Sequence, residues 1–178
     1  PSPPPPPSAH SLPTSNDLAE YPAWLTEHPA ATPAQAVPNP RTTLAHEQDS
    51  YLCGDSDDRE WETDVAGFGR VFPHSFGDGT SPYFTTWLTL SPAGDRLVLD
   101  FAKEALVNEQ LGADEVTDYL SVSFSSTDYV GHVFGPSSLE AEDNILRLDR
   151  AIGELLSFVD AKVGLENTLV ALSADHGG

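Results

Sequence analysis

The sequence predicts an α/β fold in which parallel strands alternate with flanking helices. Two apolar runs, residues 119–124 and 167–173, are typical of buried strands. Between Ser137 and Gly164 the apolar residues recur at steps of three and four, which indicates one long helix. The order strand, helix, strand with short connections predicts parallel strands joined by right-handed crossovers.

Two more elements are expected ahead of this unit. Residues 84–90 are rich in aromatic and β-branched side chains and predict a short strand, followed by a turn over residues 91–95. Residues 96–111 carry an apolar stripe at helical spacing and predict a helix that Gly112 ends.

The long helix has a recognisable start signal. Ser137 is expected to cap it, with Glu140 three residues later completing a capping box. Acidic side chains in the first turn suit the positive end of a helix dipole. The residues predicted to face the core are Ile145, Leu148, Ile152, Leu155 and Val159.

Changes in composition divide the chain into three regions. Residues 1–16 are predicted to be a Pro-rich disordered leader, residues 17–95 an irregular region resembling a cap or insertion, and residues 96–178 a partial α/β metal-binding core. In the middle region Asp55, Asp57 and Glu60 invite a calcium-loop interpretation. The glycine that such a loop needs at its midpoint is missing, which favours a solvated loop.

The composition excludes several classes of partner. A formal net charge of −20 argues against nucleic acid and against anionic membranes. No apolar run approaches the length of a membrane span, although hydrophobic residues make up 39% of the chain. No signal peptide is expected at the start of the sequence, an observation that is compatible with a secreted, processed protein.

Metal-type ligands follow both strands of the main unit. Asp128 and His132 are four residues apart, so a helical turn places both on one face. Asp175 and His176 are adjacent, and the glycines after them allow a turn in which both side chains converge. Ligands gather at the carboxyl ends of parallel strands, and carboxylate with imidazole suits zinc or manganese. The alternative is a turn-forming aspartate and a surface histidine at each place.

Residues 123–136 closely resemble the metal-binding segment of the alkaline phosphatase superfamily. The similarity is to PafA-type alkaline phosphatases, which sit among the type I phosphodiesterase/nucleotide pyrophosphatase-like proteins. It continues through residues 140–149 and 172–177. Fainter similarity is found at residues 21–24, 72–74, 91–95 and 100–102. The resemblance implies a partial alkaline-phosphatase-like parallel sheet with flanking helices, plus an irregular cap-like insertion.

The resemblance also implies an activity. It indicates a periplasmic or secreted two-zinc hydrolase of small-molecule phosphate monoesters, with Asp128 and His132 on one Zn²⁺ and Asp175 and His176 on the other. The family's metal-bound Thr or Ser nucleophile and its phosphate clamp match no position of this sequence. The chain is therefore expected to be an internal fragment that is inactive alone. A phosphodiesterase or nucleotide pyrophosphatase on the same scaffold, and a non-catalytic degenerate metal-binding module, are the alternatives.

Overall fold

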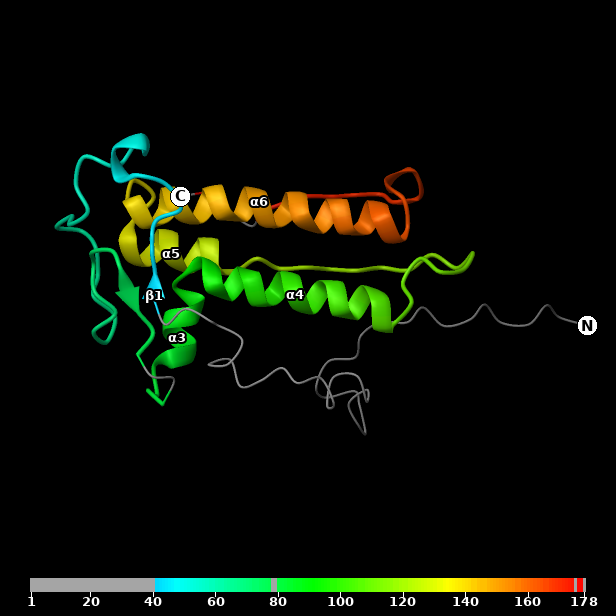
Figure 1. Ribbon diagram of the computed structural model, residues 1–178, viewed down its shortest axis with the longest axis horizontal. Coiled ribbons are helices and arrows are strands. Elements are labelled where there is room, and N and C mark those ends of the chain that lie inside the picture. Colours follow the sequence, from blue (N-terminus) through cyan, green and yellow to red (C-terminus); the bar gives the residue numbers. More distant parts are fainter. Residues whose placement is uncertain (1–40, 78–79, 175, 178) are drawn as a thin grey trace, which may run out of the picture.

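Helices are the main regular elements of the described residues. A computed structural model describes residues 41–77, 80–174 and 176–177, so the predicted leader lies outside the described residues. The helices are α3 (Phe84–Thr89), α4 (Pro92–Asn108), α5 (Ser126–Phe134) and α6 (Leu139–Lys162). The two longest, α4 and α6, pack against each other along the length of the molecule (Figure 1). Together they form the frame on which the other elements lie.

The remaining elements are short. Strands β1 (Arg41–Thr42) and β2 (His74–Ser75) pair antiparallel, and this is the only sheet within the described ranges. Two 3-10 turns, η1 (Gln48–Ser50) and η2 (Leu165–Asn167), complete the set.

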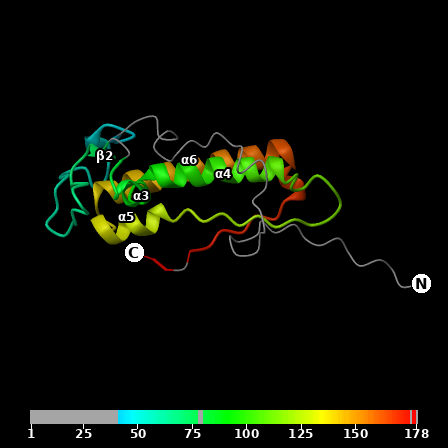
Figure 2. The ribbon, with the colours of Figure 1, turned by 90° about the horizontal axis from the view of Figure 1, so that it is seen from below.

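The predicted parallel strands keep an extended path but do not pair. Residues 119–124 and 168–173 both run back along the helices toward the end of the molecule where α5 lies (Figures 1 and 2). Several of their apolar side chains are exposed, namely Tyr119 by 81%, Leu169 by 97% and Leu172 by 82%, whereas Leu120, Val122 and Phe124 are half-buried. A strand needs a neighbour to bond its backbone groups, and no described segment supplies one here. A parallel sheet is therefore absent from the described residues.

The predicted strand at residues 84–90 is wrong, because this segment forms helix α3. Phe84 and Leu88 are one helical turn apart, and both are buried in the same hydrophobic cluster. A run this short fits a helix with two apolar residues four apart as well as it fits a strand. Packing of that helical face against the core decides the outcome.

Helix α4 confirms the predicted helix but begins earlier, at Pro92. The side chain of Ser91 accepts a hydrogen bond from the Ala93 amide at 3.3 Å, and Pro92 occupies the first turn. The expected turn over residues 91–95 is therefore the start of the helix. Gly112 follows the helix with a φ of +74°, a conformation that glycine adopts without strain.

Helix α6 is capped by Ser138 instead of Ser137. The Ser138 hydroxyl donates to the Gly135 carbonyl at 2.7 Å and accepts from the Ala141 amide at 3.0 Å. The predicted apolar stripe is only partly covered, since Ile145 is 54% exposed and the other members are half-buried. The buried residues of α6 cluster at its N-terminal end: Leu139, Glu140, Ala141, Asp143 and Asn144.

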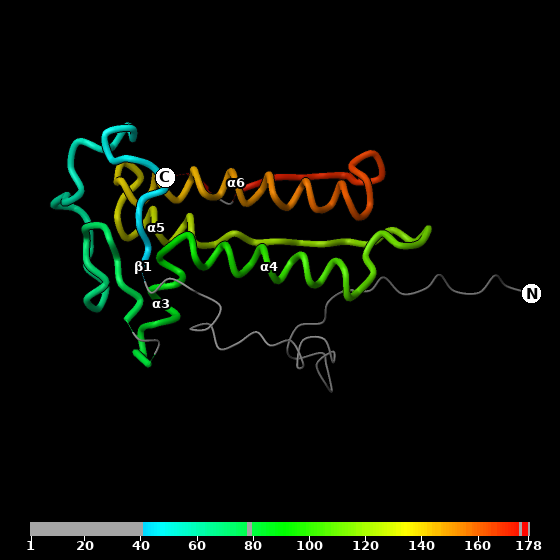
Figure 3. Tube along the Cα trace, in the orientation of Figure 1, coloured from blue at the N-terminus to red at the C-terminus, as the bar shows by residue number. Residues whose placement is uncertain are grey.

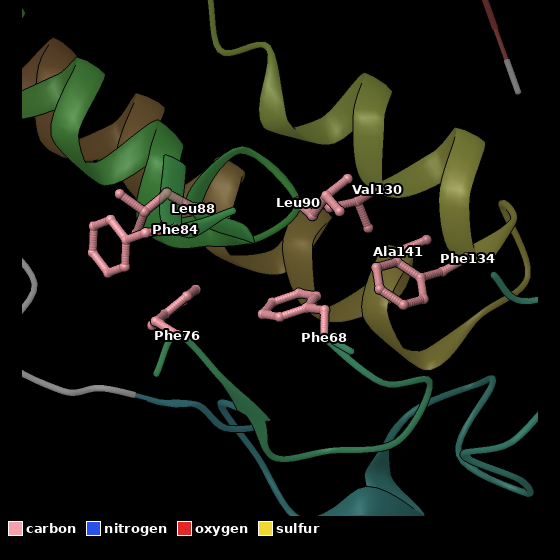
Figure 4. Close-up of a cluster of buried hydrophobic side chains, with 8 residues drawn as sticks. All are labelled: Phe68, Phe76, Phe84, Leu88, Leu90, Val130, Phe134 and Ala141. Atoms are coloured by element: carbon pink, nitrogen blue, oxygen red, sulfur yellow. The ribbon is translucent and has the colours of Figure 1, made fainter. Parts of the chain in front are cut away.

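The hydrophobic core lies at that same end of the molecule. Figure 4 shows the cluster that joins the segment before α3 to helices α3, α5 and α6: Phe68, Phe76, Phe84, Leu88, Leu90, Val130, Phe134 and Ala141. The Cα trace shows that the irregular segment before α3 also lies at this end of the molecule (Figure 3). Residue 96 lies inside α4, and the division into three regions stays a prediction.

Buried polar contacts fix the irregular segment to α6. His74 is 1% exposed and Glu140 is 4% exposed, with Nε2 of the histidine 2.9 Å from Oε1 of the carboxylate. Nδ1 of His74 faces the Phe68 carbonyl at 3.2 Å, and since a carbonyl only accepts, Nδ1 is the donor in that contact. The Glu140 side chain therefore contacts a histidine of another segment. In the predicted capping box it would have accepted a hydrogen bond from the start of its own helix.

The acidic stretch around Asp57 is only partly solvated. Asp57 is half-buried, and its carboxylate accepts the Phe72 amide at 2.9 Å. Burial, together with repulsion from Glu140, raises the pKa of Asp57 to about 6. This residue therefore packs against the segment before β2, while Asp55 and Asp58 remain at the surface.

Candidate metal centre

Helix α5 presents two of the predicted ligands on one face. Val130 and Phe134 are 1% and 0% exposed and anchor the opposite face in the core. Asp128 and His132 are spaced by four residues on the outward face, and their side chains are 41% and 66% exposed. The helical period therefore separates an apolar face that holds the helix from a polar face that is open to a ligand.

The open face carries a close pair of donor atoms. Oδ1 of Asp128 lies 3.2 Å from Nε2 of His132. The predicted helical turn is confirmed, and it points both side chains the same way. Gly135 ends the helix with a φ of +90°, where the Gly135 amide bonds the Gly131 carbonyl at 2.9 Å. The chain can therefore turn away three residues after the second ligand.

His176 reaches this pair from the far end of the chain. Its Nε2 lies 3.0 Å from Oδ1 of Asp128, and its ring centroid is 5.4 Å from that of His132. Nδ1 of His176 lies 3.1 Å from the Gly177 carbonyl, which can only accept, so Nδ1 is the donor in this contact. The backbone contact at Nδ1 orients the ring so that Nε2 is the nitrogen that faces Asp128 and could bind a metal.

The three side chains lie close enough together to belong to one metal centre. One donor atom from each of Asp128, His132 and His176 lies within 4.8 Å of the others. Donor atoms on a tetrahedral zinc at about 2.0–2.1 Å sit about 3.3 Å apart, close to the separations of 3.2 and 3.0 Å measured from Asp128. Two imidazoles and a carboxylate form a donor set that zinc accepts, with a position left for water or substrate.

The structure therefore brings together three of the four predicted ligands. Asp175, the fourth, lies outside the described residues. Asp128, His132 and His176 lie close together, but the parallel sheet at whose edge they were expected to meet is absent from the described part of the chain.

A shallow hollow adjoins the candidate centre. Its volume is about 490 Å³, and it is lined by Trp61, Gly131, His132, Gly135, Pro136 and Ser137. Trp61 is 58% exposed, and a Cβ added to Gly135 would lie 3.0 Å from the Trp61 indole. The absence of a side chain at residue 135 lets the indole lie directly over the end of α5. No sequence pattern indicated this contact.

No helix of the described residues is both long enough and apolar enough to cross a bilayer.

The fold and the centre define a class of protein: the described residues are mainly helical and carry carboxylate and imidazole donors on one face of the short helix α5. Residues 11–178 match the family described as type I phosphodiesterase / nucleotide pyrophosphatase. The match covers nearly the whole chain. This chain belongs to that family.

Individual relatives narrow the similarity to PafA-type alkaline phosphatases, as the sequence motifs predicted. The alkaline phosphatase PafA of Elizabethkingia meningoseptica is 39% identical over 161 residues, covering 89% of this chain and 29% of the relative. The alkaline phosphatase PhoV of Synechococcus elongatus is 36% identical over 169 residues, covering 90% of this chain and 29% of the relative.

A solved structure supports the fold. The crystal structure of the alkaline phosphatase PafA superposes with a TM-score of 0.73 at 35% identity, covering 82% of this chain and 28% of the other. The superposition therefore supports the alkaline-phosphatase-like α/β fold that the sequence predicted. The chain spans less than a third of the length of these relatives.

Proposed function

We propose that the whole protein hydrolyses small-molecule phosphate monoesters outside the cytoplasm, with zinc held by Asp128, His132, Asp175 and His176. The observation that carries this proposal is the convergence of His176 on Asp128 and His132. Membership of the type I phosphodiesterase / nucleotide pyrophosphatase family and similarity to alkaline phosphatases support it. The location outside the cytoplasm rests on the sequence resemblance alone.

Two zinc ions agree with the spacing of the donors. Nε2 of His132 and Nε2 of His176 each lie about one hydrogen-bond length from the same oxygen of Asp128. Ions held on these two histidines would be near neighbours, as in phosphatases with two metals about 3.5–4 Å apart. We assign Asp128 and His132 to one ion, and Asp175 and His176 to the other.

The residues of this chain would bind and orient, while another part of the protein supplies the nucleophile. Bound zinc would activate a Thr or Ser hydroxyl and stabilise the leaving oxygen. Asp128 and the two histidines would fix where that charge sits. A dication pair would also reverse the local field of a chain whose formal charge is −20, so that an anionic ester can approach.

The test is zinc-dependent hydrolysis of p-nitrophenyl phosphate by the whole protein. Removal of zinc by a chelator should abolish turnover, and added Zn²⁺ should restore it. His132→Ala and Asp175→Ala should each lower kcat/KM by at least about a hundredfold, because a ligand lost from a catalytic metal disturbs both charge and geometry. His46→Ala is the matched control, since His46 is exposed and contacts Arg150 instead. Undiminished turnover in either ligand variant would contradict the assignment.

A phosphodiesterase remains the second candidate, since the matching family bears that description. Assaying bis-p-nitrophenyl phosphate beside the monoester separates the two activities. A higher kcat/KM for the diester would replace the monoesterase proposal. Zinc binding without turnover of either ester would indicate a non-catalytic metal-binding module.

A further inference from the structure

Two buried side chains hold the residues that directly precede Asp128. Oδ1 of Asp95, from α4, accepts the Ser126 amide at 3.1 Å. Nδ2 of Asn144, from α6, donates to Oγ1 of Thr127 at 2.8 Å. The first turn of α5 is therefore tied to both of the long helices, one residue ahead of a candidate metal ligand.

Asp95 takes the place of a local helix cap. Ser125, at the N-cap position of α5, makes no side-chain capping bond, which leaves the first amides of the helix without a local acceptor. Asp95 supplies the acceptor from another helix and is 4% exposed. Burial raises the pKa of Asp95, and the hydrogen bonds from Ser126 oppose that rise. A carboxylate in such a place costs stability unless a specific contact needs it.

A glycine in α4 allows this close contact with α5. A Cβ added to Gly94 would lie 2.5 Å from Oγ of Ser126 and 2.9 Å from the Leu88 carbonyl oxygen. Any larger residue would push the two helices apart. The close approach allows the side chain next to Gly94, that of Asp95, to reach the Ser126 amide.

The burial of Asn144 has a cost in stability, because one of its polar atoms lacks a hydrogen-bond partner within the described ranges. It is 1% exposed, yet its Oδ1 has no partner among the described residues, and the same holds for Oδ2 of Asp95. Both residues line a cavity of about 460 Å³ between β1, α4 and α6, and none of Asp128, His132 and His176 lines it. A buried polar atom without a hydrogen bond carries a desolvation penalty, which an apolar residue of similar size would not have.

We infer that Asp95 and Asn144 are positioning residues that fix the first turn of α5 and so hold Asp128 in place for metal ligation. The inference rests on the proposed function only in requiring that Asp128 binds zinc. Metal sites need ligands held within about 0.5 Å, and the partners that orient ligands are worth roughly 10–100-fold in metal affinity. The two long helices supply that rigidity through residues 126 and 127.

The test measures zinc affinity of the whole protein by competition with a chromophoric chelator, independently of turnover. Asn144→Leu and Thr127→Val each remove one side of the same hydrogen bond. Each should weaken zinc binding about 10–100-fold, and the double variant should bind no more weakly than the worse single one. Asp95→Leu should weaken binding similarly. Asp95→Asn, which keeps an acceptor oxygen, should recover most of that loss.

Asp143→Asn provides the matched control on the same helix turn. Asp143 is 0% exposed and bonds Tyr51, Ala45 and Arg147. Its substitution should lower the unfolding midpoint of the zinc-free protein and leave zinc affinity within about twofold of wild type.

Equal zinc affinity in Asn144→Leu and wild type would overturn the inference. So would a loss of affinity in Asp143→Asn as large as that in Asn144→Leu, because the effect would then follow general destabilisation of α6. A wild-type protein that does not bind zinc at all would overturn the proposed function and this inference with it.

Discussion

Burial separates a structural histidine from a candidate ligand in this molecule. His74 lies against Phe68 with ring centroids 4.8 Å apart and is 1% exposed, so its ring belongs to the core. His132 is 66% exposed and faces Asp128. Both histidines pair with a carboxylate, yet only the second leaves room for an ion. Sequence spacing found Asp128 and His132, whereas Asp95 and Asn144 carried no recognisable pattern because their partners come from other helices.

Asp57 should limit stability above pH 6. Its folded pKa of about 6 is raised from 3.8 by burial, so the folded protein keeps a proton that the unfolded chain releases. Ionisation therefore costs stability as pH rises from about 4 to about 6. Asp57→Asn should raise the free energy of unfolding by about 1–2 kcal/mol at pH 8, allowing for solvent screening. The gain should shrink toward zero near pH 4.

Urea unfolding across pH 4–8 checks this expectation. Asp58→Asn is the control, since Asp58 is exposed and pairs with Arg70 at the surface. A gain from Asp57→Asn that does not vary with pH would refute the role given to the buried carboxyl.

At the scale of elements, the start of α6 can be tested at two adjacent serines. Ser138 is 0% exposed and caps the helix, whereas Ser137 is exposed. Ser138→Ala should lower the free energy of unfolding by about 1–2 kcal/mol, because it removes the acceptor for the Ala141 amide. Ser137→Ala should change it by less than about 0.5 kcal/mol. Chemical denaturation measures both, and equal losses would support a cap at Ser137.

Sequence reasoning was most successful for the elements that carry their own signals. The long helices α4 and α6 have apolar periodicity, caps and closing glycines within their own residues. Residues 84–90 were assigned wrongly because six or seven residues cannot separate a period of 2 from a period of 3.6. Residues 119–124 and most of the predicted strand at 167–173 have the expected extended backbone, although Asn167 ends η2. Neither segment pairs with another described segment, and no local pattern specifies a partner.

At the scale of the whole molecule, the two extended segments leave apolar side chains exposed that would be buried in a complete sheet. Residues 119–124 and 168–173 include the exposed side chains of Tyr119, Leu169 and Leu172, and the chain spans less than a third of the length of its relatives. Burial of such surface is the main favourable contribution to folding. These two segments are therefore the expected contact with the rest of an alkaline-phosphatase-like sheet.

Hydrogen exchange can check that expectation. In the isolated 178-residue chain, amides of residues 168–173 should exchange much faster than those in the middle of α6. In the whole protein both sets should be protected, because the strands would then be paired. Strong protection of residues 168–173 in the isolated chain would mean that they pair with something other than the rest of the fold.

The contact between His176 and Asp128 has a topological effect. It joins the tail to the start of α5 and encloses all of α6 in a ring of chain. A metal centre built from ligands on both sides of this contact would act as a reversible cross-link that restricts the unfolded chain. Removal of the metal by a chelator should release the segment after α6, so protease cleavage there should become much faster.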